Sequence, residues 1–496
     1  MMITKYSDKE ITEIQGEDNK VKEWQNTELA VNSARVNLKK IPEEIGEQIN
    51  EILSQHPIDL KVWKEMEKLF DHDLAAFIAE RQRLLPPELK GFLHDEGMTS
   101  YDTEEPAFAQ ILKESIAVIE KLCFGICETL TAMAPKYRYT IMNGRTHGQE
   151  AELQTFGKRC LTWFQVLRFD IGNLKRAQEG LRHSKISGAI GNYGSLDPEI
   201  EREALEILGF KPFYGATQIM PREVYAPIGQ ALCQIVLTLD KIALDIRLGA
   251  RSGRPIFQEP FGKKQKGSSA MPHKKNTIKC ERIAGMARLA KGYLDMIMDN
   301  IETWEERAIE QSSVERIAWP DLFHVTAYSL KIMEEVLAGL MIFPDNMLLE
   351  VVDSRGCYAS SEAKEFLKKL GFDFGITTED AYRIVQLAAF NAFEPGKSRK
   401  ELRDIIPTSL SEGDNLLVKA GNIADLGPIS IKEIIAEGRL KFSDQLDISE
   451  EKVGEWNAIL GKMFEDEQRR KKWSQIFLPS YLLRNEAVLY QKILNI

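Results

Sequence analysis

The sequence predicts an all-α protein organised around a bundle of long helices, and two features of its central region carry that prediction. Between about residues 106 and 350 proline is sparse, with none between Pro272 and Pro320. In the same region apolar residues recur at three- and four-residue spacing, as they do from Ile111 to Ile126. Runs of this length are typical of long helices packed side by side. The sequence shows no βαβ rhythm, dinucleotide glycine fingerprint or P-loop, which argues against a doubly wound nucleotide fold.

Three regions follow one another along the chain of 496 residues, a length too great for one ordinary core. Residues 1–105 alternate short helical patterns with turns and predict an amino-terminal helical domain. Residues 106–350 predict the central long-helix bundle, with further helical runs at about 225–250 and 282–310. Residues 351–496 show shorter helical patterns and more loops, and they predict a carboxy-terminal helical domain that ends in a charged, helical, atypical tail.

Composition limits the classes of function. A net charge of −10 argues against non-specific nucleic-acid binding, which needs a basic face. No apolar run approaches the ~18 residues that a membrane span requires, and the amino-terminal stretch lacks the apolar core of a secretory signal. The six cysteines show no zinc-like pairing and fit reduced thiols. We therefore expect a cytoplasmic protein that binds neither nucleic acid nor a membrane.

The stretch from Gly267 to Asn276, which reads G-S-S-A-M-P-H-K-K-N, is the most informative part of the chain. Its hydroxyls, lysines and amide can hold carboxylates, because Lys supplies a point charge and Asn a directional donor. By composition alone such a stretch is more often a solvated basic turn. Three more lysines precede it, and a local positive cluster in an acidic protein suits a small polyanionic substrate: Lys263, Lys264 and Lys266.

The order of residues in this loop resembles the signature G-S-S-x-M-P-x-K-x-N of the fumarase/aspartase superfamily, whose members eliminate fumarate from a succinyl group. With His273 before Lys274, the loop is most similar to that of the adenylosuccinate lyase family. Taken singly, the other matching segments have ordinary explanations, such as a helix start or a helix cap, but together they form a matched series. These segments are Asp71-His72-Asp73, Gly97-Met98-Thr99-Ser100-Tyr101-Asp102, Arg145-Thr146-His147-Gly148-Gln149, and Gly215 through Gln218 to Arg222, the last of which resembles the family's substrate-contacting segment T-Q-x-x-x-R.

A further segment, with Arg307, Ser312, Ser313 and Arg316, resembles the one with which this family grips the nucleotide phosphate. Two arginines and a serine make a good oxyanion fork, because a guanidinium supplies several parallel donors. Ordinary pairing on a helix surface would account for Glu315 but not for the whole pattern. Carboxymuconate cycloisomerases share the M-P-H-K loop yet bind no nucleotide, so this segment favours the nucleotide-cleaving family.

The resemblance implies β-elimination of fumarate from adenylosuccinate, giving AMP, and from succinylaminoimidazole-carboxamide ribotide, giving AICAR, in purine nucleotide biosynthesis. It assigns Ser268 as the general base and His147 as the general acid, with preorganised donors stabilising the carbanion. The implied catalytic residues are Ser268, His147, His72, Lys274 and Glu281. The implied substrate-binding residues are Lys5, Tyr6, Thr99, Ser100, Thr146, Gln218, Asn276, Arg307, Ser312 and Arg316. No metal and no organic cofactor is expected.

The family also implies a homotetramer in which three chains build each site, so that motifs far apart in one chain meet between subunits. Two positions depart from the family pattern: Lys5-Tyr6 replaces an Arg-Tyr pair that in the family contacts the phosphate, and Thr277 replaces a proline. The alternatives are an argininosuccinate lyase or carboxymuconate cycloisomerase on the same fold, or a non-catalytic helical scaffold. The phosphate segment counts against the first two, and the retained set of candidate catalytic residues counts against the third.

Overall fold

The structure, a computed structural model, describes residues 2–94, 97–393 and 421–495. The protein is all-α, as the sequence predicts, and the strands among the described residues form three sheets of two strands each. The chain divides into two compact units, and the residues of α6, α7, α9 and α11 fall into both. The first unit is Met1–Ile126, Leu167–Leu244 and Ile278–Val336, and the second is Cys127–Val166, Asp245–Thr277 and Leu337–Ile496. The three domain boundaries expected from the sequence remain predictions.

The first unit holds the amino-terminal helices and the larger part of the long ones. Its helices outside the bundle are α1 (Lys9–Ile14), α2 (Glu17–Asn37), α3 (Glu43–Gln55), α4 (Leu60–Phe70), α5 (Asp73–Gln82), η1 (Lys90–Phe92), η2 (Gln178–Arg182), α8 (Pro198–Ile207) and η3 (Arg222–Val224). The long helices are α6 (Ser100–Lys136), α7 (Phe156–Ala177), α9 (Ala226–Gly249), α10 (Ile278–Asp299) and α11 (Ile309–Ala338). The strands β3 (His183–Ser184) and β4 (Lys211–Pro212) pair in parallel.

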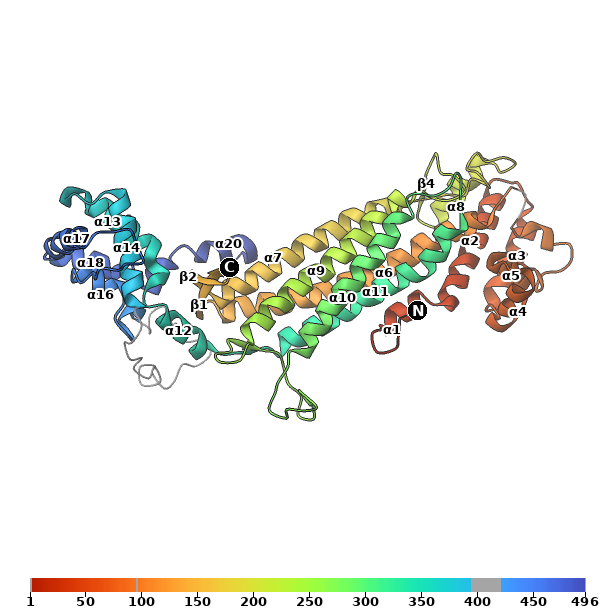
Figure 1. Ribbon diagram of the computed structural model, residues 1–496. Coiled ribbons are helices and arrows are strands. Elements are labelled where there is room, and N and C mark those ends of the chain that lie inside the picture. The colour runs from red at the N-terminus through yellow and green to blue at the C-terminus, as the bar shows by residue number, and fades with distance from the viewer. Residues whose placement is uncertain (1, 95–96, 394–420, 496) are drawn as a thin grey trace. The chain divides into compact units, whose positions relative to one another are not determined.

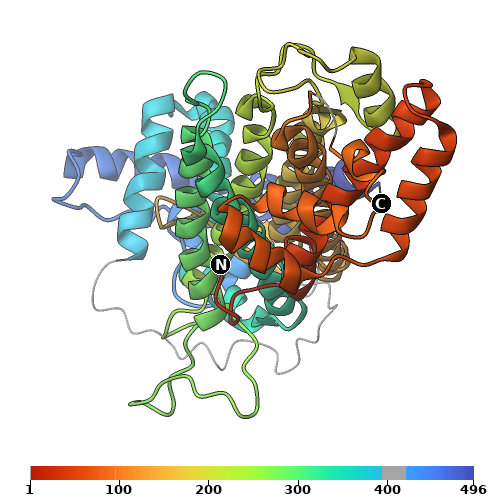
Figure 2. The ribbon, with the colours of Figure 1, turned by 90° about the vertical axis from the view of Figure 1, so that its right-hand side faces the viewer.

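The amino-terminal helices, red and orange in Figure 2, close over an aromatic core. Trp24 of α2 lies edge-on to Trp63 of α4, with ring centroids 6.1 Å apart, and to Phe77 of α5, at 5.6 Å. All three side chains are buried. Their large apolar area makes this contact the main anchor of α4 and α5, and α5 begins with candidate site residues.

The long helices of the first unit lie side by side (Figure 1), which confirms the predicted bundle. The ring of Phe108 in α6 lies edge-on to Tyr225 and to Trp319 in α11, with centroids 5.3 and 6.1 Å apart. Asn173 of α7 donates a hydrogen bond of 3.2 Å to Gln234 of α9. The helical run expected at about 225–250 is present as α9. None of the helices in the described ranges has both the length and the apolar character that crossing a membrane requires.

The helical run expected at about 282–310 is wrong in its second half, because α10 ends at Asp299 and a loop of residues 300–308 follows. The side-chain amide of Asn300 donates 3.0 Å to the carbonyl of Gln311 and ties the loop to the start of α11. Side-chain bonds of this kind compete with the helix ladder, and apolar spacing does not report them. The consequence is that Arg307 lies in a loop.

The second unit contains a hairpin, two short strands and the carboxy-terminal helices. Its strands are β1 (Ile141–Thr146), β2 (Gln149–Thr155), β5 (Phe257–Gln258) and β6 (Met341–Ile342), and both pairs, β1–β2 and β5–β6, are antiparallel. Its helices are α12 (Pro344–Asp353), η4 (Cys357–Ala359), α13 (Ser360–Leu370), η5 (Phe372–Phe374), α14 (Thr378–Ala392), η7 (Ile423–Asp425), α16 (Ile431–Ala436), α17 (Glu450–Met463), α18 (Glu467–Gln475), α19 (Pro479–Leu482) and α20 (Ala487–Leu494).

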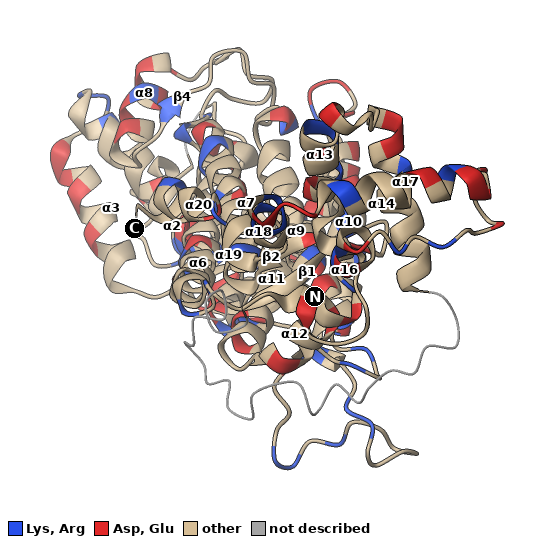
Figure 3. Ribbon diagram, turned by 90° about the vertical axis from the view of Figure 1, so that its left-hand side faces the viewer, with Lys and Arg blue, Asp and Glu red and all other residues tan. Residues whose placement is uncertain are grey.

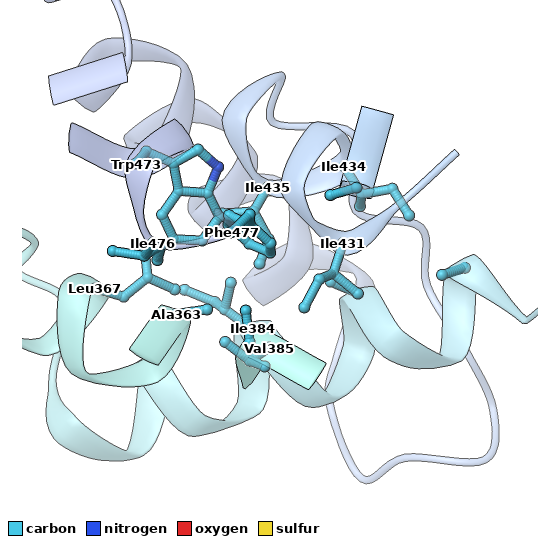
Figure 4. Packing of buried hydrophobic residues seen from close by; sticks show 14 of the residues in the cluster. Ala363, Leu367, Ile384, Val385, Ile431, Ile434, Ile435, Trp473, Ile476 and Phe477 are labelled. Carbon is cyan, nitrogen blue, oxygen red and sulfur yellow. The ribbon is translucent and has the colours of Figure 1, made fainter. Parts of the chain in front are cut away.

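The charged tail is helical, as predicted, and its apolar residues complete the core of the second unit. Figure 4 shows Trp473 and Phe477 lying among residues of α13, α14 and α16, including Leu367. The indole of Trp473 donates 2.9 Å to the carbonyl of Lys432, and the Tyr358 hydroxyl donates 3.1 Å to the carbonyl of Phe477. The polar ends of both buried aromatics are therefore satisfied, and the tail is an integral part of this core.

Candidate active site

His72 and Ser100, two candidates 28 residues apart, meet at the start of α5. His72 is the amino-terminal cap of this helix, and its Nδ1 accepts the N–H of Ala75 at 3.3 Å. A neutral ring that accepts at Nδ1 carries its proton on Nε2. His72 Nε2 lies 3.4 Å from Ser100 Oγ, so the imidazole and the hydroxyl form one polar pair. Both side chains reach the surface of the first unit.

The Thr99-Ser100 turn is fixed by the buried ion pair of Asp102 and Lys185. Asp102 Oδ2 accepts the N–H of Thr99 at 2.8 Å, and Asp102 Oδ1 accepts the N–H of Ser187 at 2.8 Å. Lys185 Nζ lies 2.6 Å from Asp102 Oδ1, and neither side chain has any exposed surface. Such a pair, fully hydrogen-bonded, fixes the loop geometry around it, because losing either partner leaves an uncompensated buried charge. Sequence reasoning missed Lys185, since nothing local distinguishes it from other lysines.

The same lysine connects this turn to the Gln218 segment. Lys185 Nζ donates to the carbonyl of Gln218 at 3.0 Å. The side-chain oxygen of Gln218 in turn accepts from Arg307 Nη1 at 3.1 Å. The guanidinium of Arg307 lies 4.1 Å from the ring centroid of Tyr101, and its Nε is buried without a hydrogen-bond partner in the described part of the chain. The candidates Thr99, Gln218 and Arg307 are therefore joined by one chain of contacts through Asp102 and Lys185, and the Nε donor of Arg307 is left unused in it.

Arg222, which the resemblance included in the substrate-contacting segment, has a structural role instead. Its guanidinium is buried and donates to both carboxylate oxygens of Glu315 at 2.9 Å, and to Glu105 Oε1 at 2.5 Å. The hydroxyl of Tyr225 also donates to Glu105, at 2.8 Å. Because the guanidinium is buried and already paired with two carboxylates, the expected substrate contact through this residue is corrected to a bond between α6, the 215–222 segment and α11.

Arg316 and Ser312 lie in the first turns of α11. Arg316 Nη2 donates 2.8 Å to the buried carboxylate of Asp73, and half of the arginine side chain remains exposed. The Ser312 hydroxyl is buried and donates to the carbonyl of Ile309 at 3.1 Å. The structure therefore presents Arg316 to solvent and turns Ser312 towards its own helix.

Lys5 and Tyr6 pack against α11 at a different point from Arg316. The ring of Tyr6 is edge-on to Tyr328, with centroids 5.1 Å apart, and Lys5 Nζ lies 5.6 Å from the Tyr6 ring. Tyr328 is twelve residues beyond Arg316, which corresponds to about 18 Å along a helix. Within one chain, Lys5 and Tyr6 are therefore not brought to the arginine that they were expected to assist.

His147 and Thr146 lie in a β-hairpin of the second unit, where the sequence analysis expected only helices. His147 and Gly148 form the two-residue loop, with φ of +54° and +78°. Positive φ at both positions is the requirement of a type I′ turn, which explains why Gly follows His. Arg145, next to the tip, pairs with Glu150 and Glu350, both at 3.2 Å. These pairs fix an exposed imidazole on a rigid hairpin.

The signature loop of residues 267–276 closes on itself in the second unit. Asn276 Nδ2 donates to the carbonyl of Gly267 at 2.9 Å. A Cβ on Gly267 would lie 1.8 Å from the carbonyl oxygen of Lys274, so only glycine allows this close approach. Lys274 itself is exposed. In Figure 3 the loop, lowest in the view, carries basic residues and no acidic one.

Ser268 sits inside this closed loop with its oxygen facing backbone donors. Ser268 Oγ accepts the N–H of Ala270 at 3.3 Å and of Met271 at 3.1 Å. Two amide dipoles directed at one oxygen stabilise negative charge on it. Glu281, the remaining catalytic candidate, is exposed in the first turn of α10, in the first unit.

Comparison with known proteins adds to this geometry. Residues 1–292 match the protein family described as Lyase. The adenylosuccinate lyase of Aquifex aeolicus (strain VF5) is 38% identical over 403 residues, which cover 81% of this chain and 90% of that protein. The adenylosuccinate lyase of Bacillus subtilis (strain 168) is 34% identical, with 81% and 91% covered.

Two solved structures resemble the whole chain. A fumarate lyase from Mesorhizobium sp. BNC1 has a TM-score of 0.72 at 20% identity, covering 96% of this chain and 99% of that one. The beta-carboxy-cis,cis-muconate cycloisomerase from Acinetobacter calcoaceticus sp. ADP1 has a TM-score of 0.69 at 17% identity, covering 95% and 98%. At these identities the likeness shows the fold alone.

Proposed function

Because this chain belongs to the adenylosuccinate lyase family, we propose that it cleaves adenylosuccinate to AMP and fumarate, and succinylaminoimidazole-carboxamide ribotide to AICAR and fumarate. The observation that carries the proposal is the complete signature loop, folded so that Ser268 Oγ accepts two backbone N–H groups. The two substrates share a succinylamino group and a ribose phosphate, so one site serves both.

In the proposed reaction the candidate residues act one after another. Ser268, as the alkoxide, removes a proton from the carbon beside one carboxylate of the succinyl group. The electron pair forms the double bond of fumarate as the neighbouring C–N bond breaks, and His147 gives a proton to the departing nitrogen. Lys274 stabilises the charge that builds up on the carboxylate in the transition state, where fixed charges have their largest effect. Neither a metal nor an organic cofactor enters these steps.

The rest of the proposed site holds the substrate. Thr99 and Ser100 donate to its carboxylates, Gln218 orients the succinyl part, and Arg307 and Arg316 bind the phosphate. In this proposal His72 assists through its contact with Ser100. Glu281 acts on His147 from another subunit, as the superfamily resemblance implies.

Exposed apolar residues support a homotetramer with shared sites. In the described part of the first unit, the long helices carry seven large apolar side chains on their surfaces: Phe124, Phe169, Leu244, Leu289, Met296, Ile309 and Ile317. Apolar groups on several neighbouring helices are typical of an interface, and copies of one chain form closed symmetric assemblies. We propose a tetramer with four sites that acts on small nucleotides in the cytoplasm.

The direct test is the absorbance change on mixing the purified protein with adenylosuccinate. Argininosuccinate and carboxymuconate serve as controls, because enzymes of the same fold act on them. Cleavage of adenylosuccinate with release of fumarate is expected, with no change for either control. Turnover of a control substrate alone would assign the chain to another activity.

Loss of Arg316 or Arg307 is expected to weaken binding of the phosphorylated substrate selectively. Arg316→Ala and Arg307→Ala should each raise KM for adenylosuccinate by about 10- to 100-fold, because a hydrogen bond to a charged group is lost. The penalty for succinyladenosine, the same substrate without phosphate, should be much smaller. Steady-state kinetics on both substrates provide the measurement, and equal penalties would place these arginines away from the phosphate.

Glu104 is expected to make substrate binding dependent on pH. Burial, followed by the negative charge of Asp73, raises the pKa of Glu104 to about 7, against the positive charges of Lys20, Arg316 and Arg307. Above that pH the carboxylate is ionised and repels the phosphate, and below it the neutral acid does not. KM should therefore rise between about pH 6.5 and 8, a range in which a phosphate monoester with a pKa of about 6 stays largely dianionic. In Glu104→Gln this rise should disappear, and its persistence would contradict the assignment.

A further inference from the structure

Two cations in the first unit share one buried carboxylate. Lys20 Nζ lies 3.0 Å and Arg316 Nη2 lies 2.8 Å from the same oxygen, Oδ2 of Asp73. The Asp73 side chain is 8% exposed, whereas Lys20 is 28% and Arg316 50% exposed. The carboxylate is thus at the base of the cluster, and the two cations lie between it and the solvent.

Asp73 is held firmly and stays ionised. Its Oδ1 accepts the N–H of Leu74 at 2.9 Å, and its carbonyl accepts the indole N–H of Trp63 at 2.9 Å. Burial acts to raise the pKa of Asp73, but Lys20, Arg316 and the hydrogen bonds outweigh burial, and the pKa lies below its ordinary value. Asp73 sets one negative charge against two positive charges, and Glu104, whose pKa burial and the charge of Asp73 raise to about 7, adds a second negative charge only above that pH. The cluster therefore has a net positive charge below about pH 7.

Lys20 is oriented as well as charged. Its ammonium lies 4.4 Å from the ring centroid of Trp24, a buried residue of the aromatic core. An ammonium has three donors, and Asp73 takes one of them. The ring face and the carboxylate together fix the direction of the ammonium, so little entropy is lost when it binds an anion.

We propose that Lys20 is a further cation for the substrate phosphate, which it binds together with Arg316, and that Asp73 is the positioning residue that sets the spacing of these two side chains. This inference rests on the proposed function and names a residue for which the sequence pattern carries no signal. A phosphate dianion is matched better by two cations than by one. Lys5, the cation expected there from the family pattern, packs about 18 Å further along α11 in the same chain.

The test replaces Lys20 by methionine and compares it with Lys22→Met. Lys22 lies on the same helix and pairs with Glu23 at 3.3 Å, but its side chain is largely exposed and lies outside the cluster. Lys20→Met should raise KM for adenylosuccinate about 10- to 100-fold, with kcat changed far less. KM for succinyladenosine should not change, and inorganic phosphate should inhibit the variant more weakly by a similar factor. Lys22→Met should behave as the wild type.

Two further variants separate binding from folding. Lys20→Arg keeps the charge and should restore most of the affinity for the phosphorylated substrate. Asp73→Asn removes the shared carboxylate and should raise KM for adenylosuccinate but not for succinyladenosine, because the cations lose their fixed spacing. If Lys20→Met does not fold, Lys20→Gln, which keeps a donor for Asp73, carries the same expectation.

The outcomes distinguish this inference from the proposed function. If the wild type does not cleave adenylosuccinate, the proposed function fails. If the wild type cleaves it and the Lys20 variants raise KM equally for both substrates, or not at all, the pair with Asp73 is only structural and the inference is overturned. A loss of phosphate inhibition confined to the Lys20 and Asp73 variants, with Lys22→Met unaffected, supports it.

Discussion

Replacing Ser268 with alanine is expected to lower turnover by about 10²- to 10⁴-fold, the usual contribution of a general base. The hydroxyl oxygen faces the N–H groups of Ala270 and Met271, which stabilise an alkoxide and have no comparable effect on the neutral substrate. Since the lost interaction exists only in the transition state, the dissociation constant of the substrate should change little. Single-turnover kinetics together with equilibrium binding of adenylosuccinate provide the measurement.

Ser269→Ala is the matched control for this prediction. Ser269 is the adjacent hydroxyl in the same loop, and its side chain is exposed. Its loss should cost little turnover, whereas Gly267→Ala should disrupt the loop, because a Cβ would lie 1.8 Å from the Lys274 carbonyl. If Ser268→Ala retains near-full turnover while both variants fold, Ser268 is not the base.

Mixing two inactive variants is expected to restore activity from nearly zero. His147→Ala lacks the proposed acid, and Ser268→Ala lacks the proposed base. If each site takes these residues from different subunits, about one quarter of the sites in randomly mixed tetramers receive both wild-type side chains. The mixture should therefore recover up to about that fraction of wild-type activity. Activity after dissociation and reassociation, followed with sedimentation, provides the measurement.

Two controls make the mixing experiment decisive. Each variant taken alone through the same dissociation should stay inactive, and subunit exchange should be confirmed independently. The physical basis is visible in the first unit, where Lys5 and Tyr6 pack on Tyr328, about 18 Å along α11 from Arg316. A fully active monomer, or no recovery of activity after confirmed subunit exchange, would contradict the shared-site proposal.

Part of the candidate site can be predicted from the order of residues, because the hydrogen bonds that shape it join residues close together in the sequence. The loop from Gly267 to Asn276 closes through bonds among its own residues, so its pattern and its geometry coincide. The His147-Gly148 turn is also local, and the His-Gly pair is the sequence signal for this hairpin, although the helical pattern of the region predicts none. The helical class and the tail helices follow likewise from short-range periodicity.

Other roles depend on partners that are distant in the chain. Arg222 looks like a substrate ligand in the sequence, but it is bound by Glu315, 93 residues away, and its guanidinium is buried. Lys185 is an ordinary lysine until the fold buries it against Asp102. A charged side chain becomes a ligand or a structural pair according to which groups surround it and how much water remains. The spacing of residues in the sequence reports neither which groups surround a side chain nor how much water remains around it.

The sequence by itself therefore determined the family, the helical class and the identity of the signature loop, because these rest on residue order and short-range periodicity. Only the tertiary structure decided that Arg307 lies in a loop, with its guanidinium over the ring of Tyr101. Only the tertiary structure likewise brings Lys20 and Arg316 to the same carboxylate of Asp73, which lies 243 positions from Arg316 in the sequence. The physical reason is that charge, burial and donor direction are set by contacts across the fold, and those contacts form only when distant helices pack together.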